Sequence, residues 1–321
     1  MKNDFVVGVD VGGQTSKIGV VDKDGKILAQ SVMRSDIFGS DEDKYLSALA
    51  EEIKKNIKEA GKEGQIRGVG VGAPNGNFYE GTVYNAPNLA WAIGKTVPFA
   101  KVLSKKLGGI PVALTNDANA AALGEKIYGA AKDMKDFIMI TLGTGVGSGI
   151  VIDGKLVYGH DGFAGELGHT TAVRGGRQCN CGLQGCLETY CSAIGVARTA
   201  KEWLETRKDP SLLRNVNIEA ISSKDVYDAA KAGDKLALEI FNFTGTLLGQ
   251  SFANFVHFSA PEAIVLFGGL ARSKEFLTEP IMKAMNENLL PAWKNKIKLV
   301  YSALKESDAA ILGASALAWD L

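Results

Sequence analysis

Short apolar runs separated by turns open the chain. Residues 5–11 are largely β-branched and end in a pair of glycines, a second run spans 18–21, and a third spans 27–32 after a turn rich in Asp and Gly at 22–25. Runs of this kind joined by such turns are typical of β-hairpins. The pattern therefore predicts three strands at the start of the chain, connected as hairpins.

A helical period follows the first strands. Leu46, Leu49, Ile53 and Ile57 recur at intervals of three and four residues with Glu and Lys between them, which indicates a helix with one apolar face. After a loop at 73–88, strands and helices alternate, and this order favours an α/β fold with a largely parallel central sheet. The predicted strands are 68–72, 112–115, 137–142, 150–152, 263–267 and 297–301. The predicted helices are 97–107, 118–128, 188–205, 222–232, 235–257, 275–288 and 308–319.

Length and composition are those of a globular protein with two lobes. The chain has 321 residues, more than a single core of roughly 250–300 residues accommodates. We expect a smaller N-terminal lobe over 1–122 and a larger lobe over 123–304, with the last helix, about 305–321, packing back on the first lobe. Lys+Arg and Asp+Glu both number 36, so the chain lacks the basic surface of a nucleic-acid binder. A small-molecule partner, and no nucleic acid, is expected.

No targeting or membrane segment is expected from the sequence. The N-terminal apolar run is interrupted by Asp10, and no later stretch approaches the roughly 18 uninterrupted apolar residues of a membrane span. The sequence therefore predicts a cytoplasmic protein with no membrane partner.

The first glycine-rich turn, DVGGQTSK, lies between the first two strands. Gly12-Gly13 allows a ligand to approach the backbone closely, and successive N–H groups in such a turn bind anions. Thr15 and Ser16 add hydroxyl groups, and Lys17 adds a positive charge. The segment is equally compatible with a plain hairpin turn in which Asp10 and the glycines serve geometry alone.

A second glycine-rich turn, TLGTGVGSG, follows the strand at 137–142. Gly143, Thr144 and Gly145 lack the Gly-Lys-Ser/Thr of a P-loop, and the turn does not open a helix as a dinucleotide fingerprint does. Two such turns on two hairpins are more specific than either alone, because two facing lobes need one each to hold a nucleotide. A third pair, Gly268 and Gly269, ends a buried strand, where nucleotides bind in open α/β sheets, and is expected to lie against the adenosine.

The sequence TNDANAA ends the strand at 112–115 and begins a helix. Asp117 is a candidate general base, because phosphoryl transfer needs one oriented carboxylate near the attacking hydroxyl. Asn116 is a candidate hydrogen-bonding partner for a sugar hydroxyl. An Asp or Asn at this point is also typical of a helix N-cap, and the two roles are compatible.

Histidine and cysteine cluster between residues 169 and 186. His169, Cys179, Cys181 and Cys186 form the Cys₃His set that structural zinc prefers, and they leave no open coordination position for a catalytic water. Free buried cysteines are the alternative, although clustered cysteines in a chain without an export signal more often bind metal. Cys191 is assigned to the core.

Polar residues near this loop are candidates for sugar recognition. Glu166 and Glu188 flank the zinc loop at 169–188, which would hold them rigid as preorganised acceptors. The second ring nitrogen of His169 is available to a sugar oxygen when the first binds zinc. For both glutamates the alternative is a solvated surface charge. Asn75 and Gly76, in an amide-rich loop, are secondary candidates, or parts of an ordinary loop.

These motifs together resemble the ROK family of bacterial repressors, open reading frames and kinases. DVGGQTSK is similar to the first phosphate motif of the family, TLGTGVGSG to the second, and NDANAA to the motif of the catalytic base. GELGH followed by CNCGLQGCLE resembles the zinc and sugar signature, which is the most specific of the set. The resemblance covers nearly the whole chain.

The resemblance implies an actin-like ATPase (ribonuclease H-like) fold with two lobes flanking a nucleotide cleft. It implies Asp117 as base, Mg–ATP between the lobes, a structural zinc on the Cys₃His set, and a homodimer or homotetramer. Sugar contacts are implied for Asn116, Asp117, Glu166, His169 and Glu188. Gln14 stands where the family usually has Thr, so either Gln14 or Thr15 is expected at the transferred phosphate. The repressor branch carries a winged helix before the first strand, whereas this sequence begins at the strand, so that module is not expected.

Three hypotheses for function follow. The first is a glucokinase-like enzyme that transfers phosphate from ATP to the 6-hydroxyl of glucose, with Asp117 as base. The second keeps the chemistry and changes the sugar to N-acetylmannosamine, N-acetylglucosamine, fructose or allose. The third is a non-catalytic sugar sensor, against which the intact Asp117 and both phosphate turns argue.

Overall fold

The computed structural model describes residues 4–321, which fall into two compact units. Unit 1 contains the described residues up to Met134 together with Gly149–Ala164 and Ser302–Leu321, and unit 2 contains Lys135–Ser148 and Gly165–Tyr301. The division into lobes at 122 and 304 stays a prediction. The compact units differ from it because the helix that starts at Asp117 and the segment 149–164 both belong to unit 1.

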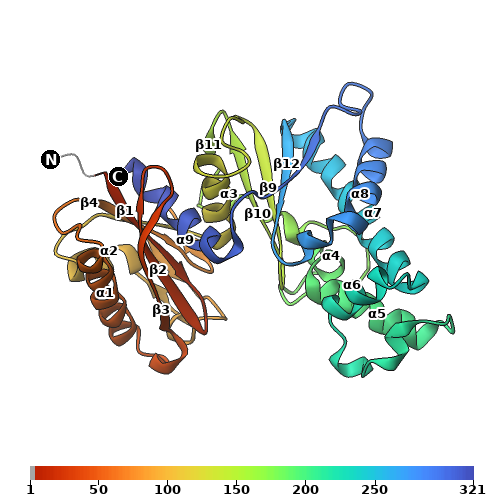
Figure 1. Cartoon of the computed structure of the whole chain (residues 1–321), viewed down its shortest axis with the longest axis horizontal. Coiled ribbons are helices and arrows are strands. Elements are labelled where there is room, and N and C mark those ends of the chain that lie inside the picture. The colour runs from red at the N-terminus through yellow and green to blue at the C-terminus, as the bar shows by residue number, and fades with distance from the viewer. Residues whose placement is uncertain (1–3) are drawn as a thin grey trace. The chain divides into compact units, whose positions relative to one another are not determined.

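Unit 1 contains a five-stranded mixed sheet in the order β3-β2-β1-β4-β8 (Figure 1). The three N-terminal strands pair antiparallel, as predicted, whereas β4 and β8 run parallel to β1. The bounds are β1 Phe5–Val11, β2 Thr15–Asp22, β3 Ile27–Arg34, β4 Ile66–Gly72 and β8 Val112–Thr115.

Alternate residues of β1 enter two different cores. Val7 and Val9 pack with α1 (Glu42–Glu59) and α2 (Phe99–Lys106) on one face, and all four apolar positions predicted for the helix at 46–57 are buried there. Val6 packs with Ile311 of α9 (Glu306–Ala316) on the other face. This division follows from the two-residue period of a strand. The sheet is therefore covered on both faces (Figure 1).

Glycines allow α9 to lie directly on the strands. A Cβ atom at Gly8 would lie 2.1 Å from the carbonyl oxygen of Ile311, and one at Gly70 would lie 1.9 Å from that of Ala314. These distances are shorter than any side chain tolerates, so the helix backbone meets the sheet backbone only because both positions lack a side chain. The last helix of the chain is in this way part of the first unit, where α3 (Asp117–Ile127) packs against it.

The segment predicted as a loop at 73–88 is partly structured. It contains β5 (Gly76–Asn77) and β6 (Thr82–Tyr84), which form a small antiparallel sheet with β7 (Thr96–Val97). Strands of two or three residues are too short to show alternation in the sequence, which is why the pattern missed them.

A second five-stranded sheet has the order β11-β10-β9-β12-β13. Its parallel part consists of β9 (Phe137–Leu142), β12 (Ala263–Phe267) and β13 (Lys298–Tyr301). β10 (Val146–Ile152) pairs antiparallel with β11 (Lys155–Leu156), and the unit boundary divides β10 between Ser148 and Gly149. Two mixed sheets replace the single, largely parallel sheet predicted from the pattern, because each glycine turn reverses the chain into a hairpin.

Helices pack around the core of unit 2. The predicted helix at 188–205 is wrong in one respect: it is divided into α4 (Glu188–Cys191) and α5 (Ala193–Thr206) by Ser192, which has an extended backbone and accepts a hydrogen bond from the N–H of Gly195. Such N-caps begin a new helix. The other helices are α6 Ser223–Lys231, α7 Lys235–Ser259 and α8 Lys274–Asn288.

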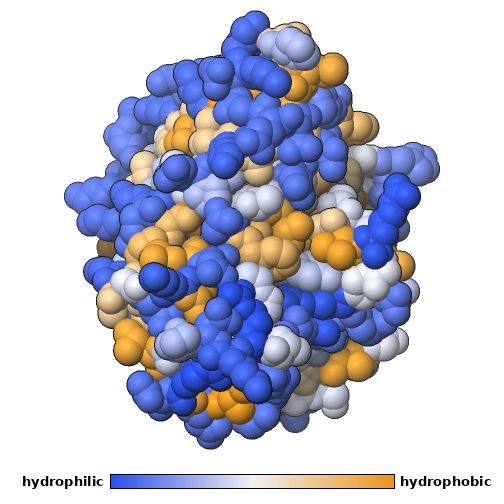
Figure 2. Space-filling model, turned by 90° about the vertical axis from the view of Figure 1, so that its right-hand side faces the viewer, coloured by the Kyte–Doolittle hydropathy of each residue, from blue (hydrophilic) through white to orange (hydrophobic). Residues whose placement is uncertain are grey.

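Apolar side chains on the surface occur in separate patches. Figure 2 shows such patches among polar residues on the face that lies at the right of Figure 1. Among the described residues, none of the helices combines the length and apolarity that a membrane crossing requires.

We predict that Gly70→Ala destabilises the protein by about 2–3 kcal/mol, because the new methyl group overlaps the backbone of α9. Urea denaturation of the variant and the wild type measures this difference. Gly68→Ala is the matched control on the same strand: its nearest neighbour is the terminal methyl of Leu321, 2.6 Å away, which can move. Equal stability of the two variants would contradict the close contact.

Candidate functional site

Two carboxylates of unit 1 lie at the carboxyl ends of strands that run parallel. Asp10 near the end of β1 is in register with Gly72 at the end of β4, and Gly72 is in register with Thr115 at the end of β8. Asp117 follows as the first residue of α3. Gly72 lies between the two acids and has no side chain. A Cβ atom at this position would lie 3.7 Å from the Cα of Asp117.

The start of α3 fixes the orientation of Asp117. The side-chain oxygen of Asn116 accepts a hydrogen bond from the N–H of Asn119 at 2.7 Å, so Asn116 is the N-cap. Oδ1 of Asp117 accepts a hydrogen bond from the N–H of Ala118 at 2.8 Å, and its side chain is exposed. Because Asn116 caps the helix, Asp117 is not required for capping, and its second carboxylate oxygen is available for another partner.

The pKa values of both carboxyl groups are raised, and the charge of Asp117 contributes to the rise at Asp10. Burial and then the nearby charge of Asp117 raise the pKa of Asp10 from 3.8 to about 6, whereas Lys17, its cross-strand partner, opposes this rise. Desolvation by the surrounding protein raises the pKa of Asp117, and the backbone N–H of Ala118 opposes it. Like charges held together favour protonation or a bound cation.

The first glycine turn is a tight connection between β1 and β2. The N–H of Gly12 donates to the carbonyl of Thr15 at 3.0 Å, and a Cβ at Gly13 would lie 2.3 Å from the carbonyl oxygen of Asn88. Gln14 and Thr15 are both exposed at the tip, so the structure does not separate these two candidates for a phosphate contact.

Ser16 does not belong with the exposed residues of this turn. It is buried, and its hydroxyl forms hydrogen bonds with Ser35 at 2.8 Å and with Tyr45 at 2.7 Å. The expectation that Ser16 adds a hydroxyl to a phosphate site is therefore wrong, because the strand alternation turns it toward the core.

The second glycine turn lies in unit 2 and is stabilised by its own backbone. The N–H of Gly143 donates to the carbonyl of Gly145 at 3.0 Å. Thr144 is exposed at the tip, and no atom lies within 4 Å of the position that a Cβ of Gly143 would occupy. The turn therefore presents backbone and a hydroxyl group to an approaching ligand.

The third glycine pair packs beside the strand that leads into this turn. Gly268 has φ of 102°, and a Cβ there would lie 2.6 Å from the carbonyl oxygen of Leu142. Gly269 has open space around it and begins the short 3₁₀ helix Leu270–Ser273. The pair thus lies next to the second glycine turn in unit 2.

The structure brings the four predicted metal ligands together. One ligand atom from each of His169, Cys179, Cys181 and Cys186 lies within 4.8 Å of all the others, and all these thiols are free. The Sγ of Cys179 is 3.8 Å from Nδ1 of His169, and those of Cys181 and Cys186 are 3.6 Å apart. Burial and the neighbouring thiols raise the pKa of Cys186 to about 12. A Cys₃His donor set of this size fits a tetrahedral zinc ion, whose charge holds the thiols as thiolates.

The remaining cysteine lies apart from the cluster. Cys191 is fully buried in the core of unit 2, and its thiol donates to the carbonyl of Thr244 at 3.6 Å. This agrees with its assignment to the core.

Arg177 is the main residue that sequence analysis missed. Its guanidinium is buried and donates to the carbonyl of Thr189 at 2.7 Å, to Thr199 at 2.9 Å and to Glu202, and it stacks over the ring of Tyr190. It therefore fastens the metal loop to α4 and α5. In the sequence, Arg174 and Arg177 both precede the cysteines, and without the fold neither is distinguishable from a surface charge.

Glu188 lies between the metal loop and the second glycine turn. Its Oε2 accepts a hydrogen bond from the N–H of Val146 at 3.1 Å, and its Oε1 lies 3.5 Å from the Sγ of Cys179. Glu166, by contrast, is exposed and precedes the 3₁₀ helix Leu167–His169. Glu188 thus contacts both motifs.

The loop of Asn75 and Gly76 lies beside the end of β8. Asn75 has φ of 52°, and its amide group donates to the carbonyls of Tyr84 and Asn85 at 3.1 and 3.2 Å. A Cβ at Gly76 would lie 2.5 Å from the carbonyl oxygen of Thr115. These two candidates are therefore neighbours of the strand that leads to Asn116 and Asp117.

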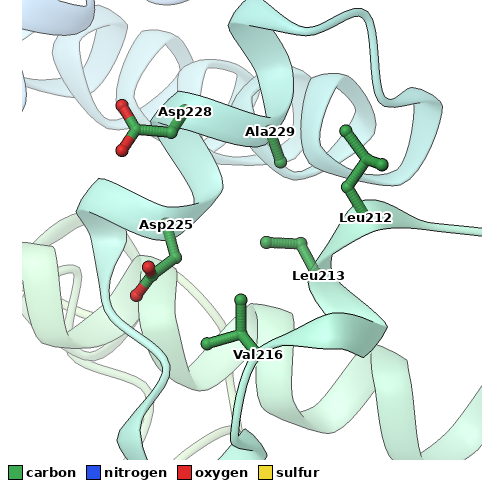
Figure 3. A pocket seen from close by; sticks show the side chains of 6 residues that line it. All are labelled: Leu212, Leu213, Val216, Asp225, Asp228 and Ala229. Carbon is green, nitrogen blue, oxygen red and sulfur yellow. The ribbon is translucent and has the colours of Figure 1, made fainter.

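A separate hollow of about 260 Å³ lies between the 3₁₀ helix Leu212–Asn215 and α6 (Figure 3). Figure 3 shows the carboxylates of Asp225 and Asp228 pointing away from the leucine side chains. Asp225 completes a capping box with Ser222, and Asp228 pairs with Lys224. None of the predicted site residues lines this hollow, and its two acids have structural partners, so it is not the candidate site.

Two α/β units, each with a strand-connecting glycine turn, define an actin-like ATPase fold. A model described as the ROK family matches residues 6–320. A glucokinase of Thermotoga maritima is 35% identical over 97% of this chain and 96% of that protein. The chain belongs to the ROK family, which confirms the resemblance and the fold class predicted from the motifs.

Solved structures agree with this assignment. The crystal structure of a ROK hexokinase from Thermus thermophilus has a TM-score of 0.83 and 30% identity, over 98% of both chains. A ROK family glucokinase from Streptomyces griseus, solved in complex with glucose and AMPPNP, has a TM-score of 0.78 and 31% identity, over 99% of this chain and 100% of that chain.

We predict that Asp10→Asn stabilises the protein at neutral pH in the absence of divalent cations. A carboxyl whose pKa rises from 3.8 to about 6 on folding favours the native state at low pH, and this advantage is lost as the pH rises through about 6. The difference in free energy of unfolding between variant and wild type should therefore shift in favour of the variant by on the order of 2–3 kcal/mol between pH 4 and pH 7.5. Urea denaturation across this pH range measures the gain. Asp24→Asn, in an exposed turn, is the control. If the stability difference from the wild type did not change with pH in either variant, the raised pKa would be contradicted.

Proposed function

We propose that this chain is an ATP-dependent hexose kinase, and specifically a glucokinase that forms glucose 6-phosphate and ADP. The observation that carries the proposal is the pair of carboxylates in unit 1, of which Asp117 is oriented by a capped helix N-terminus. The similarity to a glucokinase and to a ROK hexokinase over nearly the whole chain supports the same activity.

Asp117 acts as the general base in this proposal. Its free carboxylate oxygen accepts the proton of the sugar 6-hydroxyl as that oxygen attacks the γ-phosphorus of ATP. The bond from the sugar oxygen to phosphorus forms, the bond from phosphorus to the β,γ-bridging oxygen breaks, and ADP leaves with the electron pair. A raised pKa makes the Asp117 carboxylate a better base at neutral pH.

The glycine turns and their polar neighbours bind ATP. A bound Mg²⁺ would neutralise charge on the phosphate oxygens, and Asp10 would hold it, because the nearby charge of Asp117 favours a cation at Asp10. Lys17 supplies a further positive charge next to Asp10. The residues assigned to ATP and its metal ion are Asp10, Gly12, Gly13, Gln14, Thr15, Lys17, Gly143, Thr144, Gly145, Gly268 and Gly269.

The sugar is held by amides, carboxylates and one imidazole. Asn116 keeps its amide hydrogens available, because capping uses only its carbonyl oxygen. His169 offers the sugar the ring nitrogen that the metal does not use. The residues assigned to the sugar are Asn75, Gly76, Asn116, Asp117, Glu166, His169 and Glu188.

We also propose a structural zinc ion in the Cys₃His cluster. The four gathered ligand atoms support it, and the set leaves no position for a catalytic water. A homodimer or homotetramer, a cytoplasmic location and the absence of nucleic-acid or membrane partners stay predictions from the sequence. The other hexoses and the sensor function are outcomes that the first experiment below distinguishes.

We predict that Asp117→Asn lowers the rate of phosphorylation by about 10²–10⁴-fold, because the base is lost. Glucose binding should change little, since Asn keeps the shape and one hydrogen-bond acceptor. A coupled assay of ADP release with glucose, fructose, allose, N-acetylmannosamine and N-acetylglucosamine identifies the substrate, and calorimetry measures sugar binding. Asp133→Asn, on the surface of the same unit, is the control. Full activity in Asp117→Asn would refute the assigned base, and sugar binding by the wild type without turnover of any sugar would indicate a sensor.

We predict one equivalent of zinc per chain and its loss in Cys186→Ser. Because the metal holds three parts of the loop together, the variant should lose roughly 3 kcal/mol or more of stability. Elemental analysis and urea denaturation measure the two effects. Cys191→Ala is the control: this variant lacks a buried thiol outside the cluster and should still bind zinc. Equal metal content in wild type and Cys186→Ser would contradict the site.

A further inference from the structure

The second glycine turn is anchored by α4 and by the first residue of α5. The N–H of Ala193, just after α4, donates to the carbonyl of Gly143 at 2.8 Å. The first residue of α4, Glu188, accepts the N–H of Val146 at 3.1 Å. One end of the turn is therefore hydrogen-bonded to α4 and the other to the first residue of α5, which Ser192 joins to α4.

The metal loop is also anchored to α4. Arg177 donates to the carbonyl of Thr189 and stacks on Tyr190, and the backbone N–H of Arg177 donates to the hydroxyl of Tyr190 at 2.8 Å. At the other end of the loop, the carbonyl of Cys186 accepts two hydrogen bonds from Thr189. The N–H of Thr189 donates at 3.0 Å and the hydroxyl of Thr189 at 2.7 Å. The arrangement of Cys186 thus bears directly on the start of α4.

The carboxylate of Glu188 makes the connection between the two motifs. It is half-buried, with one oxygen on the glycine turn and the other beside Cys179. Gly145 permits this geometry, because a Cβ at that position would lie 2.3 Å from Oε2 of Glu188. This hydrogen bond holds the N–H of Val146 in one position.

We propose that Glu188 is a positioning residue for the nucleotide site: its carboxylate transmits the order of the metal loop to the second glycine turn. Loading of the Cys₃His site then strengthens nucleotide binding even when no sugar is present. By linkage, a bound nucleotide strengthens metal binding by the same factor. The inference rests on the proposed function, in that the glycine turn is taken to bind the phosphates of ATP.

The experiment measures the binding of AMPPNP with Mg²⁺ in the absence of sugar. Calorimetry compares the zinc-loaded and the chelator-treated forms of the wild type, Glu188→Ala, Glu188→Gln and the control Glu205→Gln, an exposed residue of α5. We expect zinc to strengthen AMPPNP binding of the wild type by about tenfold, within the usual range of coupling between sites. Glu188→Ala should bind AMPPNP about as weakly as the chelated wild type, with or without zinc. Glu188→Gln keeps an acceptor for Val146 and should recover most of the effect.

A second variant tests the same contact from the other side. Gly145→Ala places a methyl group against the carboxylate and should also abolish the zinc dependence of AMPPNP binding, while leaving every residue of the metal loop in place. This variant keeps the test valid if Glu188→Ala does not fold. If the wild type bound AMPPNP equally well with and without zinc, this inference would be overturned and the proposed function would not be affected. A change confined to sugar affinity in Glu188→Ala would also overturn the inference, and no AMPPNP binding by any form would overturn the proposed function as well.

Discussion

The register of three parallel strands decides the position of the reactive groups. Because β1, β4 and β8 end level with one another, two acidic side chains lie at the same edge of the sheet with only a glycine position between them. Burial and the charge of Asp117 raise the proton affinity of Asp10, and desolvation raises that of Asp117. In the proposed function, this edge of the sheet receives the proton of the sugar hydroxyl and lies next to the metal–phosphate complex.

The two units contribute different chemistry to the proposed reaction. Unit 1 supplies the acids and a turn with a lysine on the following strand, whereas unit 2 supplies the thiol and imidazole cluster and a turn without any charged residue. In unit 2, hydrogen bonds to neighbouring elements hold the second glycine turn in place. Glu188 accepts a hydrogen bond from the turn, and Arg177 binds the metal loop to α4 and α5.

Much of the fold and part of the site were predictable from the sequence, for physical reasons. The strands at 112–115, 137–142 and 263–267 have the predicted bounds because they are continuous apolar runs limited by turns. The four clustered ligands were predictable because their spacing is local. The break at Ser192 was missed because the apolar pattern continues through it, and the short strands near 76–84 because two or three residues show no alternation. The role of Arg177 was missed because its partners lie 12 to 25 residues away along the chain. Likewise, Ser16 was misassigned because burial outweighed its position next to glycines.

The placement of α9 has a consequence for biosynthesis. The N-terminal sheet is complete in sequence early, yet one of its faces is covered by a helix that is made only after unit 2. During translation, the glycine-lined face of β1 and β4 stays without its cover while all of unit 2 is made. Gly8 and Gly70 expose no side chain on that face, whereas Val6 and Val21 stay without apolar partners until α9 is made.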